Sequence, residues 1–381
     1  MGSPAADLPT IHLHGTVVLG DDHEVGDAWV VDGRLTLERP SSSSVGGGET
    51  VRLDGVVVPG LVDVHCHVGL GPDGAVGRDE AEAQAVADRD SGVLLVRDAG
   101  SPADTRWIDD RDDLPRLIRA GHHVARPKRY LRGYGRELDD VASLPGAVAQ
   151  EADRGDGWVK LVADWIDREV GDLTPLWPAD LLAEAVAVAH SRGARVTAHT
   201  FSTEALDDLL AAGVDCLEHG TGLTDDQVTE VVRRGVAVTP TLLQVARFEE
   251  IAAQGEAKFP VYAARMRRMH ERRYEHVAAL HEAGVRLLVG TDAGGTLGHG
   301  LVAQECAELV EAGVPAREVL AAASWRTRAY LGMPDQLDAR TADLVVYPAD
   351  PRTDVAVLSA PLAVVLRGAL VAPGARLPRP V

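Results

Sequence analysis

Cysteine is scarce in this sequence of 381 residues. Its three cysteines, Cys66, Cys216 and Cys306, form no CxxC pair, which excludes a disulfide framework and indicates a reducing compartment. Long hydrophobic runs are also missing, because no segment reaches the roughly 18 apolar residues of a membrane helix. The N-terminal residues lack the basic segment and apolar stretch of a secretory signal. We therefore expect a cytoplasmic protein without a membrane span.

Positive charge is in short supply as well. The chain has 38 Lys and Arg against 58 Asp and Glu, a formal net charge of −20. A basic footprint for nucleic acid or an anionic membrane is therefore missing. We expect a small-molecule substrate as partner, and a homo-oligomer is compatible with the sequence. The length and the 45% hydrophobic content suit one large domain of about 250–300 residues with a smaller one.

The two ends of the chain share a sequence pattern of short β-like runs, which differs from the pattern in the middle. Short β-like runs interrupted by Gly and Asp fill residues 1–55, which include the low-complexity segment "PSSSSVGGGE", and the same style returns in residues 340–381. We expect both ends to combine into one small β-sandwich domain. Two unrelated edge hairpins are the alternative.

Residues 56–339 alternate apolar strands with amphipathic helical segments. Eight strand candidates occur, at 57–64, 92–100, 123–131, 157–164, 194–200, 214–220, 235–243 and 285–294. Eight strands, each followed by helical sequence, predict an α/β fold of the (β/α)8 TIM-barrel type. A doubly wound open sheet is the alternative, but no Gly-rich phosphate loop follows the first strand. The segment 261–284 is expected to be an ordinary outer helix with a solvated basic face.

Polar residues interrupt these apolar strands near their carboxyl ends. The first strand, in "VVPGLVDVHCHVGLG", ends in His65 and His67, whose side chains project to the same side because strand side chains alternate. Comparable positions on the fourth, fifth, sixth and eighth strands are Lys160, His199, His219 and Asp292. In a barrel all of these converge on one mouth, and imidazoles with carboxylates suit a first-row divalent ion. Lys160 has two interpretations: a carbamate formed with CO2 that ligates metal, or a plain cation paired with a carboxylate such as Asp164.

These motifs resemble the metal-dependent amidohydrolase superfamily. "PGLVDVHCH", "HT", "EHGT" and "GTDAG" follow one another in the expected order, and the similarity covers nearly the whole chain. "VRDAG", "VKLVAD" and "GTDAGGTLGHG" are similar to the prolidase-like and Xaa-Arg dipeptidase-like subgroup, which has a carbamylated lysine. The resemblance implies a binuclear hydrolase of amide C–N bonds in a small molecule.

The resemblance also implies roles for individual residues. One of two divalent ions, with zinc expected, would be bound by His65, His67 and Asp292, the other by His199 and His219, and N-carboxylated Lys160 would bridge them. A metal-bridging hydroxide would attack the substrate carbonyl, with Asp292 as general base and then acid. His299 would lie on the substrate side. Glu305 and Asp98 match recurrent acidic positions, for which loop hydrogen bonding is an equal alternative.

Two departures from the subgroup put a dipeptide substrate in doubt. Phe201 replaces a frequent tyrosine, and "LRGYGRE" replaces a Gly-Gly-His loop after the third strand. Substitute donors to the substrate could come from a few side chains, namely Tyr134, Arg132, Arg136 and Arg168.

Other substrates and activities stay open at this point. Lactones and other cyclic esters or amides present the same carbonyl group. A mononuclear deaminase is disfavoured because Ser202 occupies the position of its proton-shuttling glutamate, and a non-catalytic scaffold is disfavoured because all six ligand residues are retained.

Overall fold

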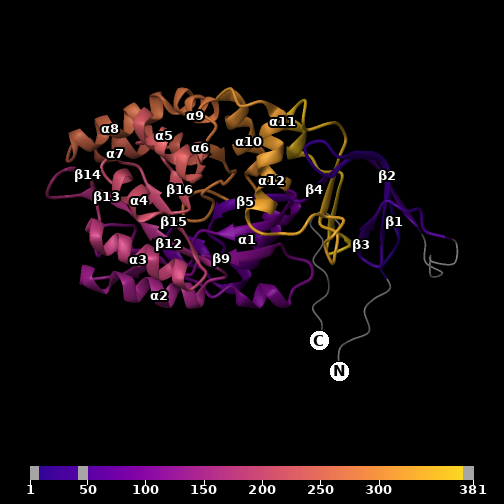
Figure 1. The fold of residues 1–381 in the computed structure, drawn as a ribbon, viewed down its shortest axis with the longest axis horizontal. Helices are drawn as coiled ribbons and strands as arrows, with labels where there is room; N and C mark the ends of the chain where they lie inside the picture. Colours follow the sequence, from indigo (N-terminus) through magenta and orange to yellow (C-terminus); the bar gives the residue numbers. More distant parts are fainter. Residues whose placement is uncertain (1–7, 42–49, 372–381) are drawn as a thin grey trace.

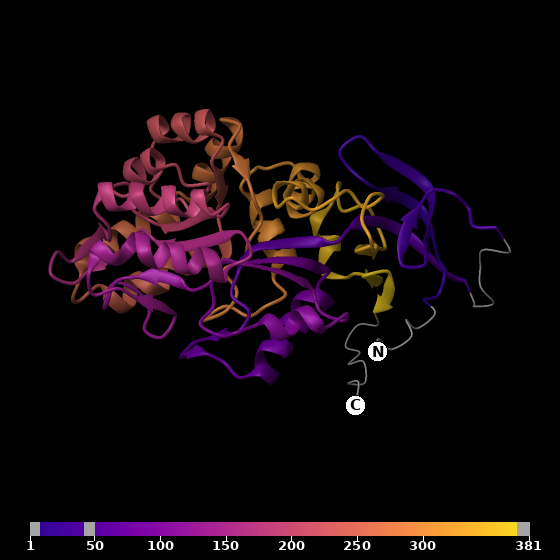
Figure 2. The same cartoon turned by 60° about the horizontal axis from the view of Figure 1, so that its bottom comes forward.

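The computed structural model describes residues 8–41 and 50–371. Most of the low-complexity segment and the outermost residues of both ends lie outside these ranges. The molecule is an α/β protein with a β-sheet at one end and a larger region of parallel strands and helices at the other (Figure 1; Figure 2).

Strands from both ends of the chain form the terminal sheet. It has seven strands in the order β21-β20-β19-β4-β1-β2-β3. Their bounds are β1 (Ile11–Val18), β2 (Glu24–Val31), β3 (Arg34–Thr36), β4 (Val51–Pro59), β19 (Leu344–Tyr347), β20 (Ala363–Leu366) and β21 (Ala369–Val371). β4 lies parallel to β1 and antiparallel to β19. The described terminal strands thus share one sheet, while the domain boundaries and the sandwich remain predictions.

The larger region contains two sheets of parallel strands. The first is β5 (Leu61–Cys66), β8 (Val93–Asp98) and β9 (Arg116–Arg119). The second has the order β11 (Gly135–Glu137), β10 (His123–Ala125), β12 (Trp158–Val162), β15 (Arg195–Thr200), β16 (Cys216–His219), β17 (Ala237–Thr239) and β18 (Arg286–Leu287). Short antiparallel pairs complete the strands: β6 (Leu70–Gly71) with β7 (Gly74–Ala75), and β13 (Asp164–Asp167) with β14 (Asp172–Pro175).

Backbone hydrogen bonds connect these sheets through the segment that follows β18. Leu288 N donates to Val238 O over 2.9 Å, and Val64 N donates to Val289 O over 3.0 Å, so the segment lies between β17 and β5. Gly290 allows this close approach, because a Cβ there would stand 2.6 Å from the Cβ of His65. The closed eight-stranded barrel stays a prediction.

Four strand predictions need correction. The candidate at 57–64 is divided between two sheets: β4 ends at Pro59, which pairs with Leu344 of β19, and Gly60 separates β4 from β5. The third candidate, 123–131, is a strand only over β10, and the eighth, 285–294, only over β18. The seventh candidate, 235–243, is a strand only over Ala237–Thr239, and its last two residues begin a helix at Leu242.

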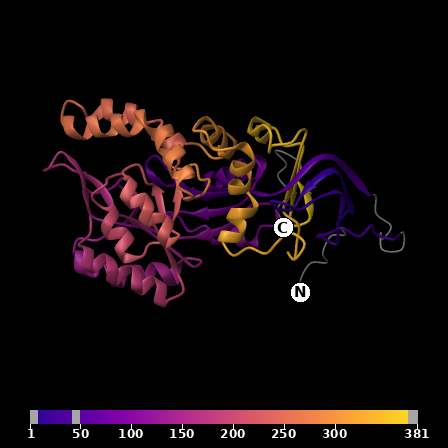
Figure 3. The same ribbon diagram turned by 45° about the horizontal axis from the view of Figure 1, so that its top comes forward.

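Helices cover both sides of the parallel strands (Figure 3). They are α1 (Arg78–Asp90), α2 (Leu144–Arg154), α3 (Ala179–Ser191), α4 (Leu206–Ala212), α5 (Asp225–Arg234), α6 (Leu242–Val245), α7 (Phe248–Gly255), α8 (Pro260–Glu271), α9 (Arg273–Glu282), α10 (Val302–Glu311), α11 (Ala316–Ala323) and α12 (Trp325–Tyr330). The segment 261–284, expected as one helix, is two helices that meet at Arg272. No helix in the described ranges combines the length and the apolar character needed to cross a membrane.

Candidate metal centre

Asp292 joins two of the histidines at the carboxyl ends of the strands. Its Oδ1 lies 2.9 Å from Nε2 of His65, on β5, and 3.1 Å from Nε2 of His67, just after β5. The backbone of Asp292 is left-handed, with φ 58°, as is that of His219 at the end of β16, with φ 64°. Such conformations are uncommon for residues with a side chain and cluster at functional sites.

Hydrogen bonds to the ring nitrogens determine how His67 and His219 face the site. His67 Nδ1 donates to Gly100 O over 2.7 Å. His219 Nδ1 lies 2.6 Å from the Thr241 hydroxyl, which itself donates to Pro240 O and therefore accepts from the ring. In the neutral ring, Nε2 then carries the lone pair in both histidines. Partners of this kind orient imidazoles for metal binding.

One lone pair, on Nε2 of His67, consequently faces a carboxylate without a proton between them. Nε2 of His67 faces the Asp292 carboxylate, and Nε2 of His219 lies 3.0 Å from Nδ1 of His199, on β15. Within the described residues, His65 Nδ1 and His199 Nε2 are buried without any hydrogen-bond partner. Electron-pair donors that converge in this way fit a bound cation, so the residues present are suited to divalent metal.

Burial disfavours the charged form of three of these imidazoles, those of His65, His199 and His219. It lowers the pKa of His219 to about 3 and the pKa of His199 well below its usual range, and it lowers the pKa of His65 as well. Neutral imidazole is the form that binds metal.

Lys160, on β12, pairs with Glu218 rather than with Asp164. Both Lys160 and Glu218 are fully buried, and Lys160 Nζ contacts Glu218 Oε2 closely. The Thr197 hydroxyl donates to Glu218 Oε1 over 2.7 Å. Burial raises the pKa of the Glu218 carboxyl, but its electrostatic interactions with His65, Lys160 and Arg97 outweigh burial and lower the pKa to about 2.

Asp164 forms hydrogen bonds with the end of β15 and the loop that follows it. It accepts hydrogen bonds from the backbone amides of Phe201 and Ser202, at 2.9 and 2.8 Å, and from the Thr200 hydroxyl. Asp164 therefore fixes the loop after β15. The alternative pairing of Lys160 with Asp164 was wrong in its partner, because Glu218 on the neighbouring strand β16 lies nearer.

Two residues of the site were missed in the sequence. Glu218 directly precedes His219 in "EHG", and that charge inside an apolar strand was the available signal. His123, on β10, is fully buried, its ring centroid is 4.8 Å from that of His67, and its Nε2 has no described partner. The doublet His122–His123 ahead of an apolar segment was the only hint of it.

A cavity of about 50 Å³ adjoins the centre. Its wall is mostly apolar and aromatic, with the side chains His67, Leu70, Tyr130, Leu131, Tyr134, Trp165, His199, Phe201, Gln244, Asp292 and Thr296 together with Gly294 and Gly295. Tyr134 is thus at the cavity. Arg132 and Arg168 are exposed and outside its lining, and Arg136 pairs with Glu151.

The remaining predicted residues contact other parts of the chain. His299 Nδ1 lies 2.9 Å from Asp88 Oδ2 on α1, and His299 is not among the residues that line the cavity. Asp98 accepts from the backbone amides of Val68 and Gly100. Glu305 accepts from those of Leu242 and Leu243. Asp98 therefore holds the loops after β5 and β8, and Glu305 holds the start of α6.

Fold and site together define an α/β protein with a buried cluster of imidazoles and carboxylates that is suited to divalent metal. The chain belongs to the amidohydrolase family, whose model matches residues 56–371. It is accordingly an enzyme acting on carbon–nitrogen bonds.

Individual proteins resemble the chain over almost its full length. An uncharacterized protein of Mycobacterium tuberculosis (strain ATCC 25618 / H37Rv) is 51% identical over 370 residues, which are 97% of this chain and 98% of the relative. A solved Xaa-Pro dipeptidase with bound methionine in its active site has a TM-score of 0.77 at 21% identity, covering 95% of this chain and 99% of its own. The ochratoxinase of A. niger has a TM-score of 0.76 at 17% identity, covering 96% of both chains. At these identities the two structures show the fold alone.

Proposed function

We propose that the protein hydrolyses an amide C–N bond of a small molecule at a binuclear metal centre on a closed (β/α)8 barrel. His65, His67 and Asp292 would hold one divalent ion and His199 and His219 the other, with N-carboxylated Lys160 between them. The observation that carries this proposal is the convergence of four buried histidines on one another and on Asp292, with the Nε2 lone pair of His67 facing the carboxylate. Zinc, a cytoplasmic location and homo-oligomerisation remain predictions.

The chemistry divides between the metal ions and Asp292. Divalent ions at this position supply Lewis acidity and lower the pKa of water toward neutrality. The Asp292 carboxylate would accept the proton of the attacking water and deliver it to the departing nitrogen. The hydrogen bonds of Gly100 and Thr241 to His67 and His219 would keep both rings in the orientation that this requires.

The cavity wall suggests the kind of substrate. Among its lining residues, which all belong to the described part of the chain, none is a lysine or an arginine. Tyr130, Trp165 and Phe201 instead offer aromatic surface. We therefore propose an amide flanked by an apolar or aromatic group.

The test compares matched compounds on the zinc- and bicarbonate-loaded enzyme. A panel would hold aryl and alkyl amides, the corresponding esters and lactones, and dipeptides with a free carboxylate. We expect the apolar amides to be hydrolysed, the activity to disappear with a chelator, and zinc to restore it. Activity that survives complete metal removal would contradict the proposed centre, and a preference for charged dipeptides would contradict the substrate class.

A further inference from the structure

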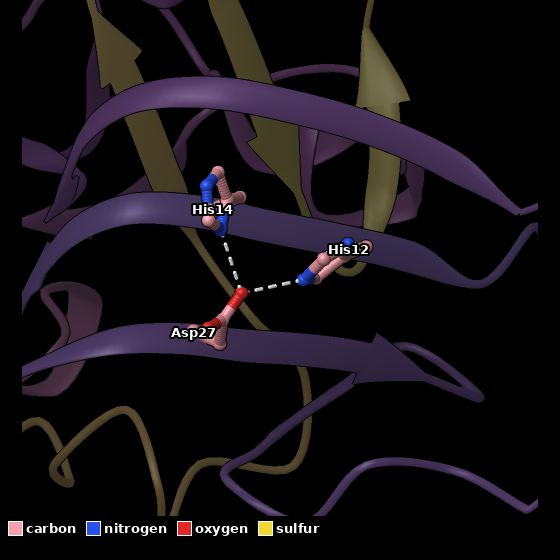
Figure 4. Close-up of side chains that lie close together, drawn as sticks. All are labelled: His12, His14 and Asp27. Atoms are coloured by element: carbon pink, nitrogen blue, oxygen red, sulfur yellow. Dashed lines mark hydrogen bonds and ion pairs between the residues drawn. The ribbon is translucent and has the colours of Figure 1, made fainter.

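A second His-x-His pair lies far from the centre, on the solvent face of the terminal sheet. His12 and His14 alternate along β1 with Ile11 and Leu13, which are completely buried. Across the antiparallel ladder, His14 faces Asp27 and His12 faces Trp29 of β2. Figure 4 shows both imidazoles turned toward the Asp27 side chain.

The three side chains converge on one point. His12 Nε2 lies 2.7 Å and His14 Nδ1 lies 2.8 Å from the same oxygen of Asp27. Donors bound tetrahedrally to a metal at about 2.1 Å stand roughly 3.4 Å apart. Small side-chain rotations would therefore place two ring nitrogens and a carboxylate oxygen around a shared ion.

The cluster is held in place and is also accessible. The His12 ring stacks on Trp29 with a centroid separation of 5.1 Å and an interplanar angle of 3°, which fixes its orientation. Side-chain exposures of 21% for His12 and 44% for both His14 and Asp27 leave room for an ion and its water ligands. On the other side of β1, Asp54 faces His14, and its neighbour Arg52 is neutralised by pairing with Asp54 over 2.7 Å.

We propose that His12, His14 and Asp27 form a separate binding site for a divalent first-row transition ion. Imidazole with carboxylate suits Cu²⁺, Ni²⁺ and Zn²⁺, with Cu²⁺ bound most tightly in the usual order of affinities. The bound ion links β1 to β2, and water completes its coordination. The net charge of −20 favours attraction of cations to the molecule. The site shares no residue with the proposed hydrolytic centre and lies in the terminal sheet, at one end of the molecule, apart from the parallel strands that hold that centre (Figure 1; Figure 2).

Trp29 provides a local optical probe for this site. The zinc-loaded enzyme would be titrated with Cu²⁺ while tryptophan fluorescence is recorded, because bound Cu²⁺ quenches a neighbouring indole. Subtracting the response of the Trp29→Phe variant isolates the signal of Trp29. We expect this signal to fall with saturation at one Cu²⁺ per chain, and hydrolytic activity of variants in the cluster to be unchanged.

Single-residue variants distinguish copper binding at His12, His14 and Asp27 from unspecific copper binding elsewhere on the protein. His12→Asn, His14→Asn and Asp27→Asn should each weaken the quenching at least tenfold, while His23→Asn, an exposed histidine just before β2, should leave it unchanged. Equal quenching of the wild type and the His12→Asn/His14→Asn double variant would overturn the proposal, as would a Trp29 signal that does not respond to Cu²⁺. Both results are read from Trp29 alone, so they stand apart from any failure of the hydrolytic centre.

Discussion

The Asp292 carboxylate contacts His65 and His67 on a left-handed backbone, a conformation that asparagine also adopts readily. Asp292→Asn keeps the size and one oxygen donor but cannot accept a proton. We expect near-normal metal content with a rate loss of at least about 10²-fold, the scale of general acid–base groups. Elemental analysis and steady-state rates on the same sample test this. Loss of both metals would show that the Asp292 carboxylate is required mainly for metal affinity, and a normal rate would move the proton elsewhere.

Lys160 is the residue whose removal should damage both stability and metal binding. In the metal-free enzyme, where Lys160 is unmodified, Lys160→Ala leaves the Glu218 carboxylate fully buried without its cation, which typically costs about 3–5 kcal/mol. It also removes the proposed bridging ligand, so we expect activity to vanish and metal content to fall. Urea unfolding and elemental analysis measure the two effects.

The double variant Lys160→Ala/Glu218→Gln separates these effects. It removes the unpaired negative charge of Glu218, so part of the lost stability should return while the metal content stays low. A Lys160→Ala enzyme that keeps two ions and turns over normally would rule out the carbamate.

At the scale of elements, the segment after β18 delivers Asp292 by packing between β5 and β17. Gly290→Ala would force a Cβ to within 2.6 Å of His65 and 2.7 Å of Thr239. We expect a loss of about 1–3 kcal/mol of stability, the usual cost of overpacking, together with reduced metal content. Gly298→Ala is the matched control, since a Cβ there meets nothing within 4 Å. Equal behaviour of the two variants in thermal unfolding would contradict this account of the segment.

α10 and α6 are connected by a buried carboxyl group. Burial raises the pKa of Glu305, on α10, from 4.5 to about 8, and nearby carboxylates add to the effect. The folded state therefore binds more protons than the unfolded state between pH 4.5 and 8, so this group's contribution to stability is lost as the pH rises through that window. Glu305→Gln cannot titrate, and its unfolding free energy should decline less with pH, by up to about 1.4 kcal/mol per pH unit. Identical slopes for the variant and the wild type in urea unfolding would contradict this.

The break between α8 and α9 illustrates what local sequence cannot reveal. Neither glycine nor proline interrupts the segment 261–284. The Arg272 side chain contacts the Thr221 carbonyl, and His276 Nε2 lies 2.9 Å from the Gly220 carbonyl, so tertiary contacts to the loop after β16 accompany the bend. A helical pattern predicts that a helix exists better than it predicts where it bends.

At the scale of the whole molecule, the features that could be predicted are those that follow from the alternation of side chains along strands and from the order of the strands in the chain. His65, His67, His199, His219 and Asp292 come together because parallel strands end at a common edge. Strands from both ends of the chain share a sheet because each set needs a partner for its backbone groups. The Lys160–Glu218 pair and the position of His123 could not be predicted. Both depend on which residues of different strands lie next to each other, and the sequence gives the order of the strands but not their register.

The measurement that tests the central claim most directly is anomalous X-ray diffraction at the zinc edge, on crystals of the enzyme prepared with zinc and bicarbonate. The account predicts two zinc peaks at the strand ends, one bound by His65, His67 and Asp292 and the other by His199 and His219. Between the two peaks, the electron density of Lys160 should extend beyond Nζ as a carboxylate. An absence of zinc from this cluster, or an unmodified Lys160 that still pairs with Glu218 beside bound zinc, would contradict it.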